Sequence, residues 1–140
     1  MNMTLTLDTD AIRMMAFFEN ITGANVKDCI MDGTEICFLI DEGGMSIAIG
    51  KNGSSVKYAE KVLKKSVKLF EFSKDLNSFV KNMIPSATDV KIRNDENGTS
   101  VEVRVDPRYK ASVIGRGKKG MKLYEDLLKR NHQVDELVLR

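Results

Sequence analysis

Hydrophobic residues in the first part of the chain switch between helical and strand-like spacing. A helix is expected first, with an N-cap at Asp8 or Thr9 and a stop at Gly23. Its hydrophobic face consists of Ala11, Met14, Met15, Phe18 and Ile21. Two strands, 26–32 and 34–41, follow as a hairpin around Asp32-Gly33. Alternation along them predicts one face made of Cys29, Met31, Ile36, Phe38 and Ile40, with Cys37 on the other.

The first half continues with a glycine turn between two helical segments and ends in a strand. Residues 43–49 form a short apolar segment that we expect to be helical. After the turn, residues 54–65 have the spacing of a helix with an apolar side and a lysine side. Val56, Ala59, Val62 and Leu63 are expected to face inward, and Lys57, Lys61 and Lys64 outward. Residues 67–72 are the last strand, with apolar residues on both of its faces.

The second half repeats this order after a junction of only Ser73 and Lys74, so we expect the two halves to be held in a nearly fixed relation. Its first helix contains Leu76, Phe79, Val80 and Met83 and ends before Pro85. Strands at 88–93 and 100–106 follow, the second with alternating valines at 101, 103 and 105. Asp106-Pro107 is a typical start for a helix that reaches Ile114. A further helix to about Asn131 and a strand at 136–139 complete the chain.

An internal repeat supports this division into halves. Residues 65 positions apart match: Gly33-Thr34 with Gly98-Thr99, Asp41 with Asp106, Ile49-Gly50-Lys51 with Ile114-Gly115-Arg116, Glu60 with Glu125, and Leu63-Lys64-Lys65 with Leu128-Lys129-Arg130. No gap is needed between Gly33 and Lys65. We therefore expect two copies of one module, at residues 1–73 and 74–140.

Composition restricts the class of protein, and the distribution of charge suggests a partner. The 140 residues are 42% hydrophobic and 30% charged, which is typical of a soluble globular protein. We find no secretory signal and no apolar run of membrane-spanning length, so we expect a cytoplasmic protein. The net charge is only +2, yet residues 51–68 contain six lysines and one glutamate. Such clusters are a candidate nucleic-acid surface, although a solvated helix face has the same pattern.

The glycine turn at residues 50–53 is the strongest candidate binding site. Gly50 and Gly53 allow a tight turn with exposed backbone N–H groups, and the helix that begins just beyond adds partial positive charge. Lys51 and Asn52 at the tip supply a cation and an amide. The turn therefore suits an anionic backbone.

The second copy of this turn departs from the pattern. The repeat aligns Gly115-Arg116-Gly117-Lys118 with the first turn, and a positive φ at Lys118 would cost on the order of 1 kcal/mol. A frame two residues later, Gly117-Lys118-Lys119-Gly120, restores both glycines but delays the helix. We favour the first frame because Met121, Tyr124 and Leu128 then keep the spacing of Val56, Ala59 and Leu63.

Enzymatic and cofactor-binding alternatives have less support. Residues 115–120 also fit the G-x-G-x-x-G pattern of dinucleotide-binding folds, with Asp135 and Glu136 about 20 residues further on, but a helix and not a strand is expected before them. His132 is the only histidine and lies near a helix end. Neither cysteine has a companion pair for zinc. We expect a binding protein with no catalytic residue, metal, cofactor or small-molecule substrate.

The element order and the two turns resemble tandem type II KH domains. Ala-Ile-Gly-Lys-Asn-Gly at 48–53 and Ile-Gly-Arg-Gly at 114–117 are similar to the paired KH modules of NusA, a family of transcription elongation and termination factors. The resemblance covers essentially the whole chain. Bacterial members carry further polymerase-binding and RNA-binding domains, so the chain is more similar to the short archaeal form. The resemblance implies an α+β fold of two αββααβ domains, each a small three-stranded sheet packed with helices.

The resemblance also implies binding of single-stranded RNA. In KH modules the turn clamps the sugar-phosphate backbone while bases lie over an apolar groove, whose floor would here include Ile47, Ile49 and Val56 unless these belong to the core. RNA polymerase is a candidate partner, and nascent RNA the candidate target. Two alternatives stay open: an RNA-binding protein of ribosome assembly or other RNA metabolism, and a protein-interaction platform that uses the acidic first helix and hairpin. The residues expected to bind RNA are Gly50, Lys51, Asn52, Gly53, Lys57, Gly115, Arg116, Gly117, Lys118, Lys119 and Lys122.

Overall fold

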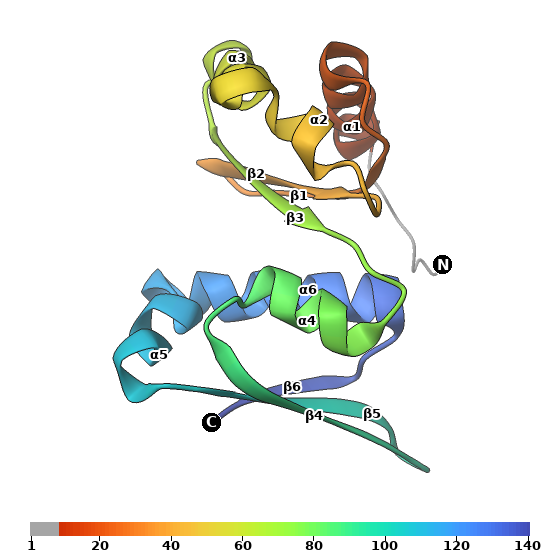
Figure 1. Ribbon diagram of the computed structural model, residues 1–140, viewed down its shortest axis with the longest axis vertical. Coiled ribbons are helices and arrows are strands. Elements are labelled where there is room, and N and C mark those ends of the chain that lie inside the picture. The colour runs from red at the N-terminus through yellow and green to blue at the C-terminus, as the bar shows by residue number, and fades with distance from the viewer. Residues whose placement is uncertain (1–8) are drawn as a thin grey trace. The chain divides into compact units, whose positions relative to one another are not determined.

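The computed structural model describes residues 9–140. They form two compact units that divide between Ser73 and Lys74 (Figure 1). Each unit contains one three-stranded sheet. The N-cap expected at Asp8 lies outside the described residues. None of the helices in residues 9–140 is both long and apolar enough to cross a membrane.

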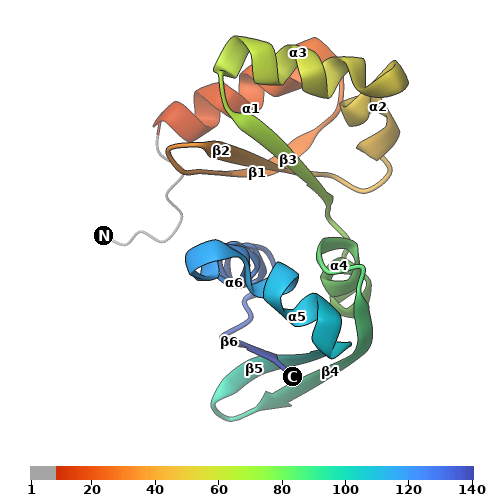
Figure 2. The ribbon, with the colours of Figure 1, turned by 90° about the vertical axis from the view of Figure 1, so that its left-hand side faces the viewer.

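In the first unit, helices cover one face of the sheet (Figure 2). The elements follow the predicted αββααβ order, with a short 3-10 turn between the second and third helices. They are α1 (Thr9–Thr22), β1 (Val26–Met31), β2 (Glu35–Ile40), α2 (Met45–Ile49), η1 (Lys51–Gly53), α3 (Ser54–Leu63) and β3 (Ser66–Glu71). The strand order is β1-β2-β3. Strand β1 pairs antiparallel with β2, and β3 pairs parallel with β2.

The predicted hydrophobic face of the first hairpin forms the core of this unit. Phe38 of β2 is fully buried and stacks on Phe18 of α1, with ring centroids 4.4 Å apart. The cluster around this pair includes Cys29, Ile36 and Ile40 of the sheet and Ala48 and Ala59 of the two later helices. Cys29 and Cys37 are both free. Gly23 ends α1 with φ +80° and donates its N–H to the Glu19 carbonyl oxygen at 2.8 Å.

Two local predictions in the first unit are wrong. The loop of the hairpin is Gly33-Thr34 and not Asp32-Gly33, because Asp32 is still paired: its N–H donates to the Glu35 carbonyl oxygen at 2.9 Å. The Asp32 carboxylate also accepts from the N–H groups of Thr34 and Glu35, each at 2.8 Å, which holds the loop one residue later. Val62 is 46% exposed and does not face inward.

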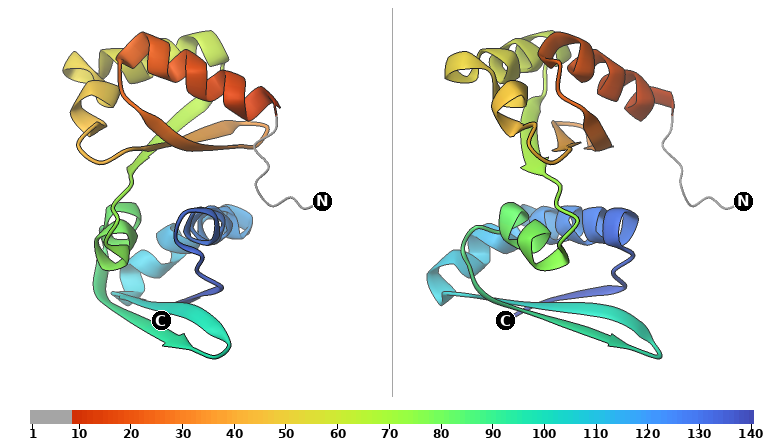
Figure 3. Two further views of the ribbon diagram at one scale, coloured as in Figure 1. Left: turned by 90° about the vertical axis from the view of Figure 1, so that its right-hand side faces the viewer. Right: turned by 45° about the vertical axis from the view of Figure 1, so that its right-hand side comes forward.

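The second unit has the same order of elements and the same sheet connectivity (Figure 3). Its elements are α4 (Leu76–Met83), β4 (Ala87–Asp95), β5 (Gly98–Val105), α5 (Pro107–Ile114), η2 (Arg116–Lys118), α6 (Lys119–His132) and β6 (Glu136–Leu139). Val101, Val103 and Val105 of β5 are buried, as their alternation predicted. Asp106 caps α5 by accepting from the Arg108 N–H at 3.0 Å, which confirms the predicted helix start. The α+β class and the αββααβ order are therefore present in each unit.

The repeat of 65 residues holds through the turns but not at the hairpin loops or at the C-terminal ends of α3 and α6. In the second hairpin, Asp95 still pairs with Gly98, so Gly98 lies in strand β5 whereas its counterpart Gly33 lies in the loop. Gly98 has φ +117°, and a Cβ there would collide with the Asp135 carboxylate. Helix α6 continues to His132 while α3 stops at Leu63. Gly33 and Gly98 are therefore aligned in the sequence repeat but occupy different structural positions.

Candidate nucleic-acid interface

The first turn joins α2 to α3. Three of its residues have a positive φ: Gly50 (+79°), Asn52 (+54°) and Gly53 (+74°). Gly50 ends α2 by donating its N–H to the Ser46 carbonyl oxygen at 3.0 Å, and Gly53 donates to the Gly50 carbonyl oxygen at 3.1 Å. A Cβ on Gly50 would lie 2.8 Å from the Ser55 nitrogen. Glycine is therefore required here by both backbone angle and space.

The second turn has the same backbone conformation at the positions that the first reading frame predicts. Gly115, Gly117 and Lys118 have φ values of +78°, +61° and +64°, close to those of their counterparts 65 residues earlier. Lys118 thus occupies the position of Gly53 in a left-handed conformation. Gly120 has a separate role, because a Cβ there would collide with the Val113 carbonyl oxygen. The alternative frame ending at Gly120 is wrong: that glycine lies inside α6 and lets the helix start pack against α5.

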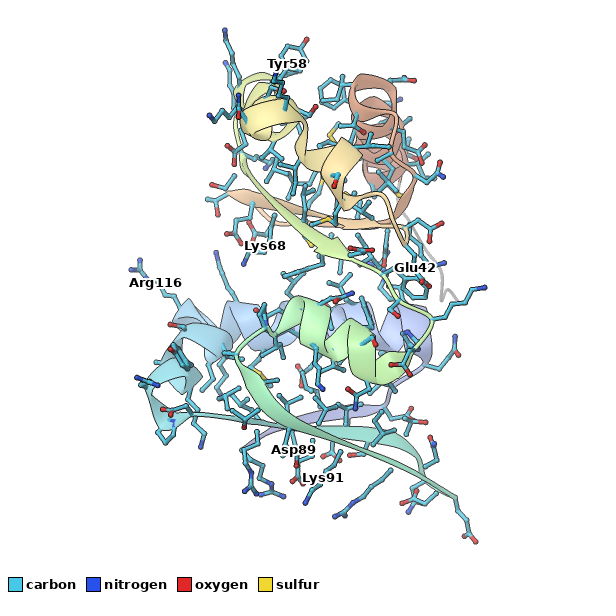
Figure 4. All side chains as sticks on the ribbon, in the orientation of Figure 1. Glu42, Tyr58, Lys68, Asp89, Lys91 and Arg116 are labelled. Atoms are coloured by element: carbon cyan, nitrogen blue, oxygen red, sulfur yellow. The ribbon has the colours of Figure 1, made fainter. Side chains whose placement is uncertain are left out.

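Exposed cations lie on or beside both turns, and the first turn also has an exposed amide. Lys51, Asn52 and Lys57 are exposed in the first unit. The Lys57 side chain lies beside the turn, with Cε 3.8 Å from where a Cβ on Gly53 would be. At the second turn and the start of α6, Arg116, Lys118, Lys119 and Lys122 are exposed. Figure 4 shows Arg116 extending away from the ribbon.

One of these cations has a partner on its own helix. Lys122 lies 3.8 Å from Asp126 one turn later, and both side chains are substantially exposed, at 78% and 38%. A surface pair of this kind contributes little to stability. Lys122 can therefore exchange the carboxylate for another anion at little cost.

None of the three apolar residues expected to floor the first groove is fully buried. Ile47 and Ile49 of α2 are 53% and 40% exposed. Val56 of α3 is half-buried. Two of the three side chains therefore present apolar surface on the helix that leads into the turn, where core packing alone would have buried them.

The single histidine and both cysteines lie outside the two turns. His132 ends α6 with its ring 5.2 Å from that of Phe79. Burial raises the pKa of the Cys37 thiol to about 12, so this thiol is neutral at physiological pH. Among residues 9–140, no group of three or more His, Cys, Asp or Glu side chains is arranged to hold a metal ion. The dinucleotide alternative is wrong, because helix α5 and not a strand precedes Gly115.

A hollow on the second unit is unsuited to RNA. Its volume is about 230 Å³, and it lies between α6 and β6. The side chains that line it include the carboxylates of Glu125, Asp126, Asp135 and Glu136. An anionic lining repels phosphate, so we do not assign this hollow to the candidate interface.

Comparison with known proteins identifies the family. A model of the KH domain matches residues 12–80. The probable transcription termination protein NusA of Halococcus morrhuae is 34% identical over 138 residues, which cover 98% of this chain and 99% of that protein. This chain belongs to the NusA family. The corresponding protein of Methanococcus vannielii is 39% identical over 115 residues, or 81% of this chain and 66% of that protein. A crystal structure of APE1850 has a TM-score of 0.79 at 29% identity and covers 96% of this chain.

NusA-family membership confirms the predicted family and the KH-type α+β fold. Similarity over nearly full length to the Halococcus morrhuae protein agrees with the short archaeal form. The NusA family consists of transcription factors, so the chain is not an enzyme. The Methanococcus vannielii protein extends beyond the matched region, since the match spans 66% of its length.

Proposed function

We propose that this NusA-family chain binds single-stranded RNA through its two turns, residues 50–53 and 115–118, as a transcription elongation or termination factor acting on nascent RNA. The observation that carries the proposal is the shared backbone of the turns, with three positive φ values in each. Both turns place exposed cations next to the start of a helix. Backbone N–H groups, helix termini and cations together favour a chain of phosphates.

In this proposal the turns contact the sugar-phosphate backbone and the flanking helices extend the contact. At the first turn the contacting side chains are Lys51, Asn52 and Lys57. At the second turn they are Arg116, Lys118, Lys119 and Lys122. The exposed Ile47 and Ile49 would lie under the bases next to the first turn. Single-stranded RNA suits this arrangement because its bases are free to turn away from the backbone.

We further propose that the transcription machinery, including RNA polymerase, is the partner. Support comes from the relatives, whose names describe probable transcription termination proteins. Co-purification with RNA polymerase is the expected result for a tagged chain. Co-purification with ribosomal particles instead would favour the alternative role in ribosome assembly.

A double replacement at the tip of the first turn tests RNA binding. Lys51→Asp with Asn52→Asp replaces a cation and a neutral amide by two anions and should lower affinity for single-stranded RNA on the order of tenfold or more. Thermal unfolding should change little, because both side chains are exposed and aspartate tolerates the left-handed conformation of Asn52. Fluorescence anisotropy with a labelled RNA measures the affinity.

A matched control is available on α4. Lys81→Asp with Asn82→Asp makes the same change of residue types at two exposed positions outside both turns. This variant should keep most of its affinity. If the two double variants lose affinity equally, net charge and not the turn accounts for the loss, and residues 50–53 are removed from the proposed site.

A further inference from the structure

Helix α5 is longer at its start than its counterpart in the first unit. Helix α2 begins at Met45, which the repeat aligns with Lys110, yet α5 begins at Pro107. The extension follows from the Asp106 cap and from Pro107 at the first helical turn. It adds Arg108 and Tyr109 to the helix, whereas the aligned residues Gly43 and Gly44 precede α2 in the first unit.

The two added side chains contact each other on the surface. The guanidinium carbon of Arg108 lies 5.1 Å from the centre of the Tyr109 ring. Asp106 also contacts Arg108, with its Oδ1 atom 3.4 Å from Nε. Tyr109 is nevertheless 43% exposed. A planar cation and an aromatic ring therefore lie together with part of the ring open to solvent.

This pair lies on the helix that leads into the second turn. Tyr109 precedes Gly115 by six residues, which corresponds to about 9 Å along a helix. Ser112, one turn closer to Gly115, is the counterpart of the exposed Ile47 in the first unit. The second unit thus has a hydroxyl where the first has an aliphatic side chain, and it has an aromatic ring one turn further from the glycine.

We propose that Tyr109, supported by Arg108, is a base-stacking residue of the second module. The inference rests on the proposed binding of single-stranded RNA and names a contact to the bases at that site. Unpaired bases stack on tyrosine rings and on guanidinium planes, and such stacking depends little on base identity. The two modules then contact bases through different chemistry, aliphatic at Ile47 and Ile49 and aromatic at Tyr109.

The test compares the full chain with Tyr109→Ala and Tyr109→Phe on two labelled probes, an oligoadenylate and an oligonucleotide of the same length whose sugars lack bases. Tyr109→Ala should bind the oligoadenylate about fivefold or more weakly. Tyr109→Phe should restore the affinity, because the ring and not the hydroxyl provides the stacking surface. On the abasic probe all three proteins should bind equally, since only backbone contacts remain.

A second exposed tyrosine provides the control. Tyr58 is 53% exposed and points outward from α3 of the first unit (Figure 4). Tyr58→Ala should leave both affinities unchanged, and circular dichroism should show both alanine variants folded. Equal loss on both probes, or equal loss in Tyr58→Ala, overturns the stacking role of Tyr109. Failure of the unmodified chain to bind either probe would instead overturn the proposed RNA binding itself.

Discussion

Gly50 and Gly115 meet two separate constraints, whereas Gly117 meets only one. The first two have φ values of +79° and +78°, and an added Cβ would lie 2.8 Å from a backbone nitrogen of the following helix. Gly117 has φ +61° but no atom within 4 Å of an added Cβ. Lys118 adopts φ +64° despite its side chain, so the fold tolerates this conformation where there is space. Close approach of the helix therefore makes the first glycine of each turn irreplaceable.

Alanine substitutions separate the two constraints. Gly117→Ala should destabilise the chain by about 1 kcal/mol, the cost of a left-handed conformation for a residue with a Cβ. Gly50→Ala should cost clearly more, because Gly50 has φ 79° and ψ 169°, a region open essentially only to glycine, and because the helix start must move away from the new methyl group. Urea unfolding measures both free energies. Equal losses would show that neither the ψ of Gly50 nor the short distance to Ser55 adds to the cost.

At the scale of whole elements, spacing and caps predicted the order of helices and strands but not where each stops. Helical spacing identified Ala59 and Leu63 as inward residues, yet Val62 on the neighbouring side is exposed. Spacing indicates the side of a helix on which a residue lies. It does not indicate how far neighbouring elements extend over that side, and this depends on the tertiary packing.

The candidate interface was also predictable only in part: the sequence located both turns but not every residue beside them. The repeat and the glycine pattern located both turns, and the spacing of Met121, Tyr124 and Leu128 predicted the frame that the backbone adopts. Tyr109 was missed, although Asp106-Pro107 already indicated a helix beginning at residue 107. Its significance depends on the exposure of the ring and on the position of the Arg108 side chain. Neither can be read from the sequence.

Helix α4 begins at a capping carboxylate, that of Asp75. The Asp75 carboxylate accepts from the Ser78 N–H at 2.9 Å and from the Ser78 hydroxyl at 2.7 Å. These hydrogen bonds hold the pKa of Asp75 below its usual value of 3.8. A depressed pKa in the folded state gives stability that is present above the unfolded pKa and is lost as the pH falls through the folded pKa.

Asp75→Asn tests this dependence, because asparagine can cap a helix but does not titrate in this range. At neutral pH the unmodified chain should have the higher melting temperature. The difference should shrink as the pH falls below about 4 and should vanish once Asp75 is protonated. Thermal unfolding followed by circular dichroism across this range gives the comparison. A difference that is independent of pH would mean that the charge of Asp75 does not contribute.

At the scale of the whole molecule, charge is segregated along the chain although the net charge is only +2. Residues 1–50 contain two basic and eight acidic residues, whereas residues 110–130 contain seven basic and two acidic ones. A small net charge gives little long-range attraction to RNA, and salt screens it further. Affinity should therefore depend on local contacts between individual cations and phosphates.

The salt dependence of binding distinguishes local contacts from a general field. If Lys51 and Arg116 each neutralise one phosphate, replacement of either by glutamine should make the slope of log affinity against log salt shallower by about 0.7, and replacement of both by about 1.4. Lys91→Gln is the control, because Lys91 is exposed on β4 and points away from the helices of its unit (Figure 4). Its removal changes the net charge equally and should leave the slope unchanged. If all three single variants shift the slope alike, the field of the whole protein and not the two turns carries the interaction with RNA.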